Sequence, residues 1–373
     1  WLFSREEKEL QFSILADLVI KEVLLTDNDA PVISLENKFG KNLMTSFRSG
    51  DTLVFYPEFI DRQGILSHQV YKCTLVGLSH SECIIRLRGR QFDATSLPPN
   101  TAWNLEPDSL DRSYLHQYEN LYEFARAPKI YIDKIVGRIP PITKTHQNFE
   151  FTNLNSNISE LVKKILSAQD YFLLWGPPGS GKTSILIKSL VEALINQTAE
   201  RILLLAYTNR AVDEICEAIE SIGLETRFDF VRIGSRYAIQ DKFQKNLLDF
   251  RLRDIPKREN IKEYVESKRI YTATIASIQG KKELFQLTNF DLVIIDEASQ
   301  ILEPNLVGLL SKFRRFILIG DHLQLPAVSA QPEASTFVKD VDLKEMGIKK
   351  LSDSFFERMF YQCKKNEWTH AYD

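Results

Sequence analysis

The chain has 373 residues, a length typical of two or three domains. With 44% hydrophobic, 11% aromatic and 26% charged residues, its composition is that of a globular protein able to bury a core. The low counts of glycine (15) and proline (14) exclude collagen-like and low-complexity character. No apolar run approaches the ~18 residues of a membrane-spanning helix, and no signal-peptide pattern is present. We therefore expect no membrane association and an intracellular protein, cytoplasmic if bacterial. Because it opens at Trp1, we also expect a fragment of a longer polypeptide.

Cysteine spacing and charge distribution give weaker signals. The four cysteines lie far apart without metal-ligand spacing, which indicates reduced, inert thiols. The net charge of −3 is uneven, because residues 227–282 hold 14 Lys and Arg against 7 Asp and Glu. Such an excess indicates either a face that binds polyanions or ordinary solvated helix surface, and charge alone favours the second interpretation.

The first third of the chain predicts a small β-barrel between two helices. A capping-box spacing at Ser4–Glu7 and apolar residues at helical intervals up to Leu18 predict a helix over residues 4–23, within a stalk segment 1–42. Residues 43–105 contain short β-rich runs separated by turn signals, which is typical of a barrel. A second helical stripe, 115–125, lies in a stalk and linker segment, 106–149. We expect the two helices to pair as a stalk that carries the barrel.

From about residue 150 to residue 373 the pattern becomes α/β. Short apolar runs alternate with helical segments, and this predicts a parallel sheet covered on both faces. The predicted strands are residues 171–175, 202–206, 270–275, 292–296 and 316–320, with a further short run at 230–233. In such sheets ligands bind at the carboxyl ends of the strands, so the residues that follow each run are the candidates for function.

The first of these strands leads into a P-loop pattern, and a helix follows it. Its backbone N–H groups and the helix N-terminus suit the phosphates of ATP. Lys182 is expected to reach the β- and γ-phosphates, and the Thr183 hydroxyl to bind Mg²⁺. A chance glycine turn is the alternative, which the strand–loop–helix context disfavours. The nucleotide-binding candidates here are Gly176, Pro177, Pro178, Gly179, Ser180, Gly181, Lys182, Thr183 and Ser184.

Two later strands end in polar residues. Asp296, after an apolar run, fits a Mg²⁺ ligand, and Glu297 is placed to polarise a water for attack on the γ-phosphate. The last strand delivers Asp321 and Gln324, expected beside the γ-phosphate, with Gln324 as a sensor of that phosphate. We thus predict Glu297, Lys182 and Gln324 as catalytic residues. Solvated surface pairs and loop residues are the alternatives.

Together these segments resemble the first motor domain of superfamily 1B helicases, the group of the replication nuclease-helicase and the nonsense-mediated-decay helicase. The matching segments are GPPGSGKTS at 176–184, LLAYTNRAVDEI at 204–215, TATIAS at 272–277, DEASQ at 296–300, GDHLQLPAV at 320–328 and SDSFFERM at 352–359. The resemblance implies a RecA-like P-loop domain preceded by a small accessory barrel on a stalk. It also implies ATP-driven travel along single-stranded DNA or RNA, 5′-to-3′.

The same resemblance implies four nucleic-acid contacts, and this sequence differs from the family pattern in two features. Thr208, Asn209, Thr274 and Ser277 fall where the family grips the backbone of a single strand, although each taken alone is more often a loop cap. Ile158 stands where the family usually has a glutamine that reads adenine, and Asn155 or Asn157 is a candidate substitute. The family's second motor domain, with its transition-state arginines, is expected beyond Asp373, so this chain alone is expected to be weakly active. A nuclease is a possible fused or partner protein.

Two other functions remain open. A P-loop ATPase that remodels a protein partner fits the P-loop and DEASQ, but fits the segments at 204–215 and 320–328 poorly. A non-catalytic docking module would use the barrel, whose aromatic residues Phe55, Tyr56, Phe59 and Tyr71 are able either to stack on bases or to pack in the core, with core packing favoured.

Overall fold

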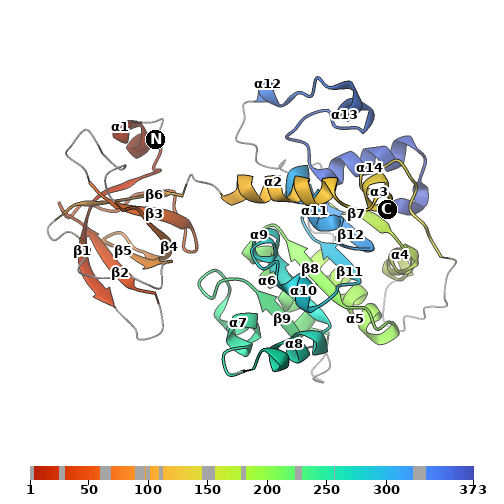
Figure 1. Ribbon diagram of the computed structural model, residues 1–373, viewed down its shortest axis with the longest axis horizontal. Coiled ribbons are helices and arrows are strands. Elements are labelled where there is room, and N and C mark those ends of the chain that lie inside the picture. The colour runs from red at the N-terminus through yellow and green to blue at the C-terminus, as the bar shows by residue number, and fades with distance from the viewer. Residues whose placement is uncertain are drawn as a thin grey trace. The chain divides into compact units, whose positions relative to one another are not determined.

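The computed structural model describes residues 4–24, 30–58, 69–88, 97, 101–108, 112–144, 156–177, 182–222, 229–255, 257–321 and 333–373. The chain divides into two compact units, Trp1–Asp111 and Arg112–Asp373. The first is a β-barrel and the second contains a parallel sheet with its helices (Figure 1). None of the helices in these ranges is both long and apolar enough to cross a membrane.

The first unit is a closed antiparallel barrel with strand order β1-β2-β5-β4-β3-β6. Every strand sends side chains into one apolar core, where the rings of Phe55 and Trp103 stack with centroids 4.3 Å apart. Tyr56 is buried as well, and its hydroxyl donates to Glu106. Phe55 and Tyr56 are therefore core residues, and Phe59 lies outside the described residues. The strands are β1 (Leu15–Leu24), β2 (Val32–Asn37), β3 (Thr52–Pro57), β4 (Tyr71–Leu78), β5 (Glu82–Leu87) and β6 (Trp103–Pro107).

The helix predicted over residues 4–23 is wrong beyond its first turns. The capping box of Ser4 and Glu7 starts α1 (Arg5–Leu10), but Phe12 adopts a left-handed conformation with φ 53° and the chain continues as β1. A bulge in β1 shifts its register against β6, so that Leu15 and Leu18 both face the core. A bulge thus places buried residues three apart, which imitates the helical period. The barrel consequently begins at β1, not at residue 43.

The second predicted helix is present as α2 (Arg112–Ala125), whereas the first is reduced to α1. Helix α2 belongs to the second unit, where it packs on α11 (Val307–Leu310). At the crossing, a Cβ added at Gly308 would lie 2.1 Å from the carbonyl oxygen of Asn120. Only glycine permits backbones to approach so closely. The contact between Gly308 and Asn120 could not be predicted from the sequence of either helix alone.

The second unit is built on a six-stranded parallel sheet in the order β7-β12-β11-β8-β10-β9, which confirms the predicted α/β fold. Strands far apart in the chain are neighbours, as in the pairing of Ile317 with Phe172 and of Ile294 with Leu204. Residues 371–373 lie along β7, where Tyr372 forms a bridge with Leu173. The strands are β7 (Tyr171–Trp175), β8 (Ile202–Ala206), β9 (Phe230–Ile233), β10 (Ile270–Thr274), β11 (Leu292–Ile295) and β12 (Arg315–Gly320).

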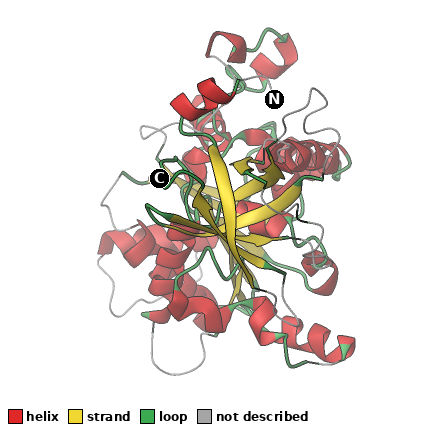
Figure 2. Ribbon diagram, turned by 90° about the vertical axis from the view of Figure 1, so that its left-hand side faces the viewer, coloured by secondary structure: helices red, strands yellow, loops and turns green. Residues whose placement is uncertain are grey.

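Helices cover both faces of this sheet (Figure 2). Alternate strand residues enter two separate cores: Phe172 and Ile294 face α4 (Ser156–Ser167), α5 (Lys188–Gln197) and α6 (Asn209–Glu220). Tyr171 and Val293 face the other core. That core is formed with α3 (Lys129–Ile135), α7 (Leu248–Arg251), α8 (Arg258–Ser267), α9 (Ile275–Gln279), α10 (Leu284–Leu287), α11 and α14 (Phe355–Lys365). Two short helices, α12 (Glu333–Thr336) and α13 (Val341–Glu345), lie before α14.

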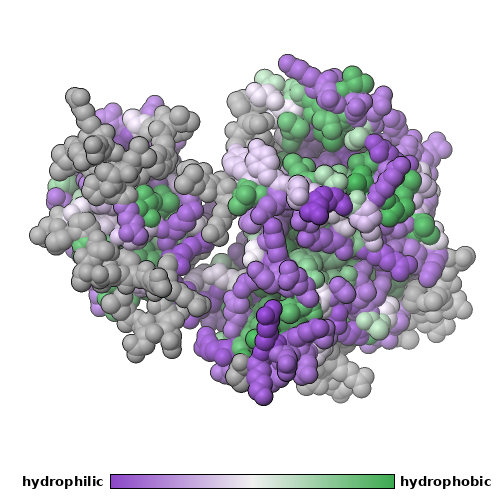
Figure 3. All heavy atoms as spheres, in the orientation of Figure 1, coloured by the Kyte–Doolittle hydropathy of each residue, from purple (hydrophilic) through white to green (hydrophobic). Residues whose placement is uncertain are grey.

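The cysteines are buried and unpaired, and the surface of the second unit is mostly hydrophilic. All four cysteines are free and buried, and burial raises the pKa of Cys216 to about 12 and that of Cys363 to about 11. Thiols with such pKa values are inert at neutral pH. Within the described residues no cluster of His, Cys, Asp and Glu is arranged to hold a metal ion by itself. The face of the second unit in Figure 3 is mostly hydrophilic, with apolar residues in separate groups.

Candidate nucleotide and nucleic-acid site

All six strands of the parallel sheet end at one edge, and the predicted functional residues follow these ends. The strands β7, β12 and β11 are consecutive in the sheet and lead to Gly176, Asp321 and Asp296. The other three, β8, β10 and β9, lead to Thr208, the end residue Thr274 and Gly234. One half of the edge therefore carries the phosphate-binding candidates, and the other half carries the candidates for nucleic-acid contact.

Asp296 and Glu297 are held at the tip of β11. Asp296 is 2% exposed; its N–H donates to the carbonyl of Leu205 at 2.8 Å, and its Oδ1 accepts from the N–H of Glu297 at 2.9 Å. Glu297 has φ 53° and ψ 35°, a left-handed conformation that is uncommon for a residue with a side chain. Its Oε2 accepts from Nε2 of Gln300 at 3.1 Å. The turn thus points two carboxylates in different directions, one buried and one half-buried.

A second set of bonds joins the ends of β7, β11 and β12. Nε1 of Trp175 donates to Oδ1 of Asp321 at 2.9 Å, and the N–H of Asp321 donates to Oγ of Ser299 at 3.2 Å. The N–H of Gly176 reaches the carbonyl of Gly320 at 3.1 Å. A Cβ at Gly320 would lie 3.0 Å from the nitrogen of Ser299, so this approach favours glycine. Asp321 is 3% exposed and its carboxylate is fixed by these neighbours.

The helix after the P-loop begins irregularly. Residues Lys182–Ile187 form a π-helical segment that passes into α5, and π-helical turns are frequent at functional sites. Of the predicted residues, Gly176, Pro177 and Ser184 are described, and Lys182 and Thr183 are described by their backbone alone. Pro178, Gly179, Ser180, Gly181, Gln324 and the alternative Asn155 lie outside the described residues. Ile158 in α4 packs against the core that α4, α5 and α6 form with the sheet. As an apolar side chain, it offers no polar group to adenine.

Two of the nucleic-acid candidates cap helices. Oγ1 of Thr208 accepts from the N–H of Ala211 at 3.1 Å and starts α6. Oγ1 of Thr274 accepts from the N–H of Ser277 at 3.1 Å and donates to its Oγ at 2.7 Å, which starts α9. Thr208 is exposed, whereas Thr274 is only 5% exposed. The capping role named as the alternative for these residues is therefore present in the structure, and Thr208 is the better placed of the two for a ligand.

Asn209 is held by an arginine that the sequence analysis did not select. Arg232 of β9 is fully buried, and its Nη2 donates to Oδ1 of Asn209 at 3.1 Å while Nη1 donates to the carbonyl of Ile233. Asp213 of α6 lies 3.6 Å from the same guanidinium. Burial lowers the pKa of Arg232 and raises that of Asp213. A charged residue inside the apolar run at 230–233 was the available signal, because a buried charge needs partners.

Other exposed groups at this edge were also missed. Tyr207, directly before Thr208, is 45% exposed, and the guanidinium of Arg236 lies 4.7 Å from the ring centre of Tyr237. An exposed aromatic ring beside cations is typical of single-strand binding surfaces. In the basic stretch, by contrast, Arg251 and Lys268 are ion-paired with Asp229, so part of that charge excess is structural.

Comparison with known proteins finds a matching family model and several similar proteins. The AAA domain family matches residues 153–263 and 251–331. The DNA replication ATP-dependent helicase/nuclease of Arabidopsis thaliana is 35% identical over 182 residues, 49% of this chain and 13% of that protein. The corresponding protein of Gallus gallus is 24% identical over 374 residues, 95% of this chain and 36% of that protein. Over these residues the chain is similar to superfamily 1 helicases of the helicase/nuclease type.

The chain spans about a third or less of the length of these relatives, so it corresponds to one part of them. Among solved structures, the arterivirus nonstructural protein 10 helicase is 14% identical, with a TM-score of 0.34, over 81% of this chain and 48% of that one. The UvsW helicase of bacteriophage T4 is 13% identical, with a TM-score of 0.32, over 52% of this chain and 61% of that one. Helicases of this kind in general use nucleotide and a divalent metal ion.

Proposed function

We propose that this chain is the first motor domain, with an accessory barrel, of an ATP-driven translocase that moves 5′-to-3′ along single-stranded DNA. One observation carries the proposal: a single edge of one sheet bears the nucleotide candidates on β7, β12 and β11 and the nucleic-acid candidates on β8, β10 and β9. Strands β11 and β8 are direct neighbours, and the N–H of Asp296 donates to the carbonyl of Leu205. This strand pair would couple a movement of the nucleotide candidates to the nucleic-acid candidates.

On the nucleotide side, the chain's own residues suit binding and hydrolysis of ATP. The oxygen donors Asp296 and Thr183 match the ligand preference of Mg²⁺, and burial of Asp296 at a strand end is costly unless a cation is served. Bound Mg²⁺ would neutralise charge on the β- and γ-phosphates. Glu297 would hold a water and accept its proton, and Gln300 would keep the carboxylate of Glu297 in one orientation.

On the other side, the first turn of α6 offers donors to phosphate. Arginine only donates hydrogen bonds, so the contact with Arg232 turns Oδ1 of Asn209 inward and leaves its Nδ2 donors for a ligand. Thr208 and Ser277 would add hydroxyl contacts from neighbouring strand ends. Contacts of this kind read phosphates and not bases, so the choice of DNA over RNA rests on the names of the helicase/nuclease relatives.

The proposal includes a second motor domain and slow hydrolysis by residues 1–373 alone. In this family a second domain supplies arginines that stabilise the transition state, and arginine fingers contribute about 10³–10⁵ in rate. The described residues contain one parallel sheet of this type. A fused or partner nuclease is proposed from the relatives as well. We also propose an intracellular setting, as expected for a protein that acts on replicating DNA.

The test measures nucleotide and strand binding separately from turnover. Residues 1–373 are titrated with a fluorescent ATP analogue, single-stranded DNA and single-stranded RNA, and ATP hydrolysis is followed with each strand or with neither. We expect saturable binding of nucleotide and of DNA, and turnover far below ~10 s⁻¹, a common value for whole enzymes. Lys182→Ala should abolish nucleotide binding without changing DNA affinity, whereas Asn209→Ala should weaken DNA binding without changing nucleotide affinity.

Two results would contradict the proposal. Turnover near ~10 s⁻¹ by residues 1–373 would show that no second domain is needed. Nucleotide binding without affinity for either strand would favour an ATPase that remodels a protein partner.

A further inference from the structure

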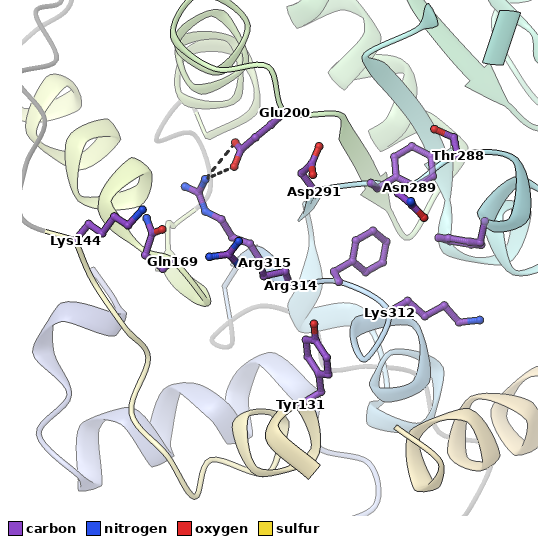
Figure 4. Close-up of a pocket in the computed structure, with 13 residues that line it drawn as sticks. Tyr131, Lys144, Gln169, Glu200, Thr288, Asn289, Asp291, Lys312, Arg314 and Arg315 are labelled. Carbon is purple, nitrogen blue, oxygen red and sulfur yellow. Dashed lines mark hydrogen bonds and ion pairs between the residues drawn. The ribbon is translucent and has the colours of Figure 1, made fainter. Parts of the chain in front are cut away.

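A polar pocket lies at the opposite edge of the parallel sheet from the proposed nucleotide site. It has a volume of about 630 Å³, within the range of small-ligand and peptide sites. Its walls come from residues that precede strands: Glu200 before β8, Asp291 before β11, and Arg314 with Arg315 at the start of β12. Figure 4 shows Lys144 at one end, Lys312 toward the other and Tyr131 of α3 pointing in from below. Neither the proposed hydrolysis nor the proposed strand binding uses this pocket.

The pocket carries an excess of positive charge. Four cations line it, against the two carboxylates of Glu200 and Asp291, and both carboxylates are already engaged. Glu200 accepts from Nη1 of Arg315 at 3.2 Å, and Asp291 accepts from the N–H of Arg201 at 2.8 Å. Lys144 and Arg314 are exposed, and the described part of the chain provides no ion-pair partner for either side chain. An anionic ligand would therefore meet cations that are free to pair.

Two polar atoms in the floor of the pocket lack hydrogen-bond partners among the described residues. The side chain of Arg315 is 8% exposed, and its Nη2 donates to the carbonyl of Ile165 at 2.9 Å, but its Nε lacks a hydrogen-bond partner among the described residues. Oγ1 of Thr288, 5% exposed, lacks one as well. Buried polar groups are seldom left in this state. Burial lowers the pKa of Arg315, so negative charge above the floor would stabilise its guanidinium.

Aromatic rings form the remaining wall. Phe290 and Phe313 are buried, and Phe285, which contacts both rings edge-on, is only half-buried. The ammonium of Lys312 lies 5.4 Å from the ring centre of Phe285. An apolar side chain placed here would bury the exposed part of Phe285 beside cations.

We propose that this pocket binds a short acidic peptide segment of a partner protein, with its carboxylates on Lys144 and Arg314 and one aromatic side chain against Phe285. The mixed lining favours a peptide over a nucleic-acid strand, because the carboxylates of Glu200 and Asp291 would repel a continuous row of phosphates. The partner would dock on the sheet edge opposite Asp296 and Thr208. It would leave the carboxyl edge open to nucleotide and strand.

The experiment measures fluorescence anisotropy of a labelled Asp-Gly-Asp-Gly-Phe peptide, whose carboxylates are spaced apart, titrated with residues 1–373. We expect saturable binding that weakens as salt rises, because the contacts are ionic. Arg314→Glu and Lys144→Glu, at exposed positions, should each raise the Kd about tenfold, the effect of placing like charge against the ligand. Lys365→Glu, an exposed lysine on α14, is the charge-matched control and should bind like the wild type. A peptide with alanine in place of phenylalanine should bind more weakly.

Three outcomes would overturn the proposal. The first is absence of saturable binding up to ~1 mM, a concentration that corresponds to only about −4.1 kcal/mol. The second is unchanged affinity in Arg314→Glu and Lys144→Glu when circular dichroism shows both variants folded. The third is displacement of the peptide by a single-stranded oligonucleotide from wild type and Asn209→Ala alike, which would make the pocket a second nucleic-acid site. None of these readouts depends on ATP hydrolysis, so the proposal stands or falls independently of the proposed motor function.

Discussion

The buried guanidinium of Arg232 donates a 3.1 Å hydrogen bond to Oδ1 of Asn209, which ties the end of β9 to the first residue of α6. The two residues are 23 positions apart in the chain. Asn209 follows β8 and Arg232 lies in β9, and β10 separates these two strands in the sheet. The bond fixes the orientation of the amide that is proposed to face the strand. Arg232 is thus a positioning residue that would act on nucleic acid through Asn209.

Replacing Arg232 by lysine should weaken single-stranded DNA binding even though Arg232 itself is fully buried. A lysine keeps the charge beside Asp213 but loses the planar fork that reaches both Asn209 and Ile233. Loss of one hydrogen bond in this setting is worth about 1 kcal/mol, or roughly a fivefold rise in Kd. Anisotropy titrations of Asn209→Ala, Arg232→Lys and the double variant would measure it. If the arginine acts through Asn209, the double variant binds no more weakly than Asn209→Ala, whereas additive losses would contradict this role.

Glu297→Gln should leave ATP binding intact and slow hydrolysis about 10²–10⁴-fold, the usual contribution of a general base. The substitution keeps the shape of the side chain and its contact with Gln300, but removes the proton acceptor. Gln300→Ala should have a smaller effect on turnover, because the carboxylate remains and only its orientation is lost. These rates are best measured with single-stranded DNA present. Equal activity of Glu297→Gln and wild type would assign the base elsewhere.

Gly308→Ala should destabilise the second unit. The new Cβ would lie 2.1 Å from the Asn120 carbonyl oxygen, so α2 has to move off α11. Overpacking of this kind costs about 1–3 kcal/mol, which urea unfolding would detect. Gly280→Ala is the matched control, since its Cβ would meet ordinary contacts at 3.6 Å. Equal stability of the two variants would mean that the α2–α11 crossing is looser than the structure shows.

Asp229→Asn should reveal a pH-dependent contribution to stability. Burial acts to raise the pKa of Asp229, but hydrogen bonds and ion pairs with Arg251 and Lys268 outweigh it and lower the pKa below 3.8. A lowered carboxyl pKa stabilises the folded state fully above 3.8, and this contribution is lost as the pH falls through the folded-state pKa. The destabilisation by Asp229→Asn, about 1 kcal/mol after solvent screening, should be constant from pH 7 to pH 5 and shrink below 3.8.

Thermal or urea unfolding of Asp229→Asn and wild type across this pH range gives the comparison. Asp249→Asn is the control, because Asp249 is 65% exposed and forms an ion pair with Lys281 at the surface. A difference between Asp229→Asn and wild type that grows toward acid would contradict the direction of the pKa shift.

The strand runs of the second unit were predictable because a buried parallel strand is a continuous apolar run, as at Ile202–Ala206 and Leu292–Ile295. The first barrel strand was not predictable, since its bulge places Leu15 and Leu18 at a helical interval. Asp296 was found because it directly follows an apolar strand run, whereas Thr208 was found through the resemblance of its segment to the helicase family. Arg232 was missed because a single arginine in a short apolar run looks like a solvent-exposed strand residue until its burial is known.

The sequence by itself determined the P-loop, the carboxylates after β11 and the alternation of strand and helix, since these depend on neighbours within a few residues. The tertiary structure alone decided which strand ends meet. The strand order β7-β12-β11-β8-β10-β9 is set by the packing of two cores on the sheet, and no local pattern encodes it. The bond between Arg232 and Asn209, the contact of Gly308 with Asn120 and the basic pocket around Arg315 all depend on that packing, because each joins segments that only the folded chain brings together.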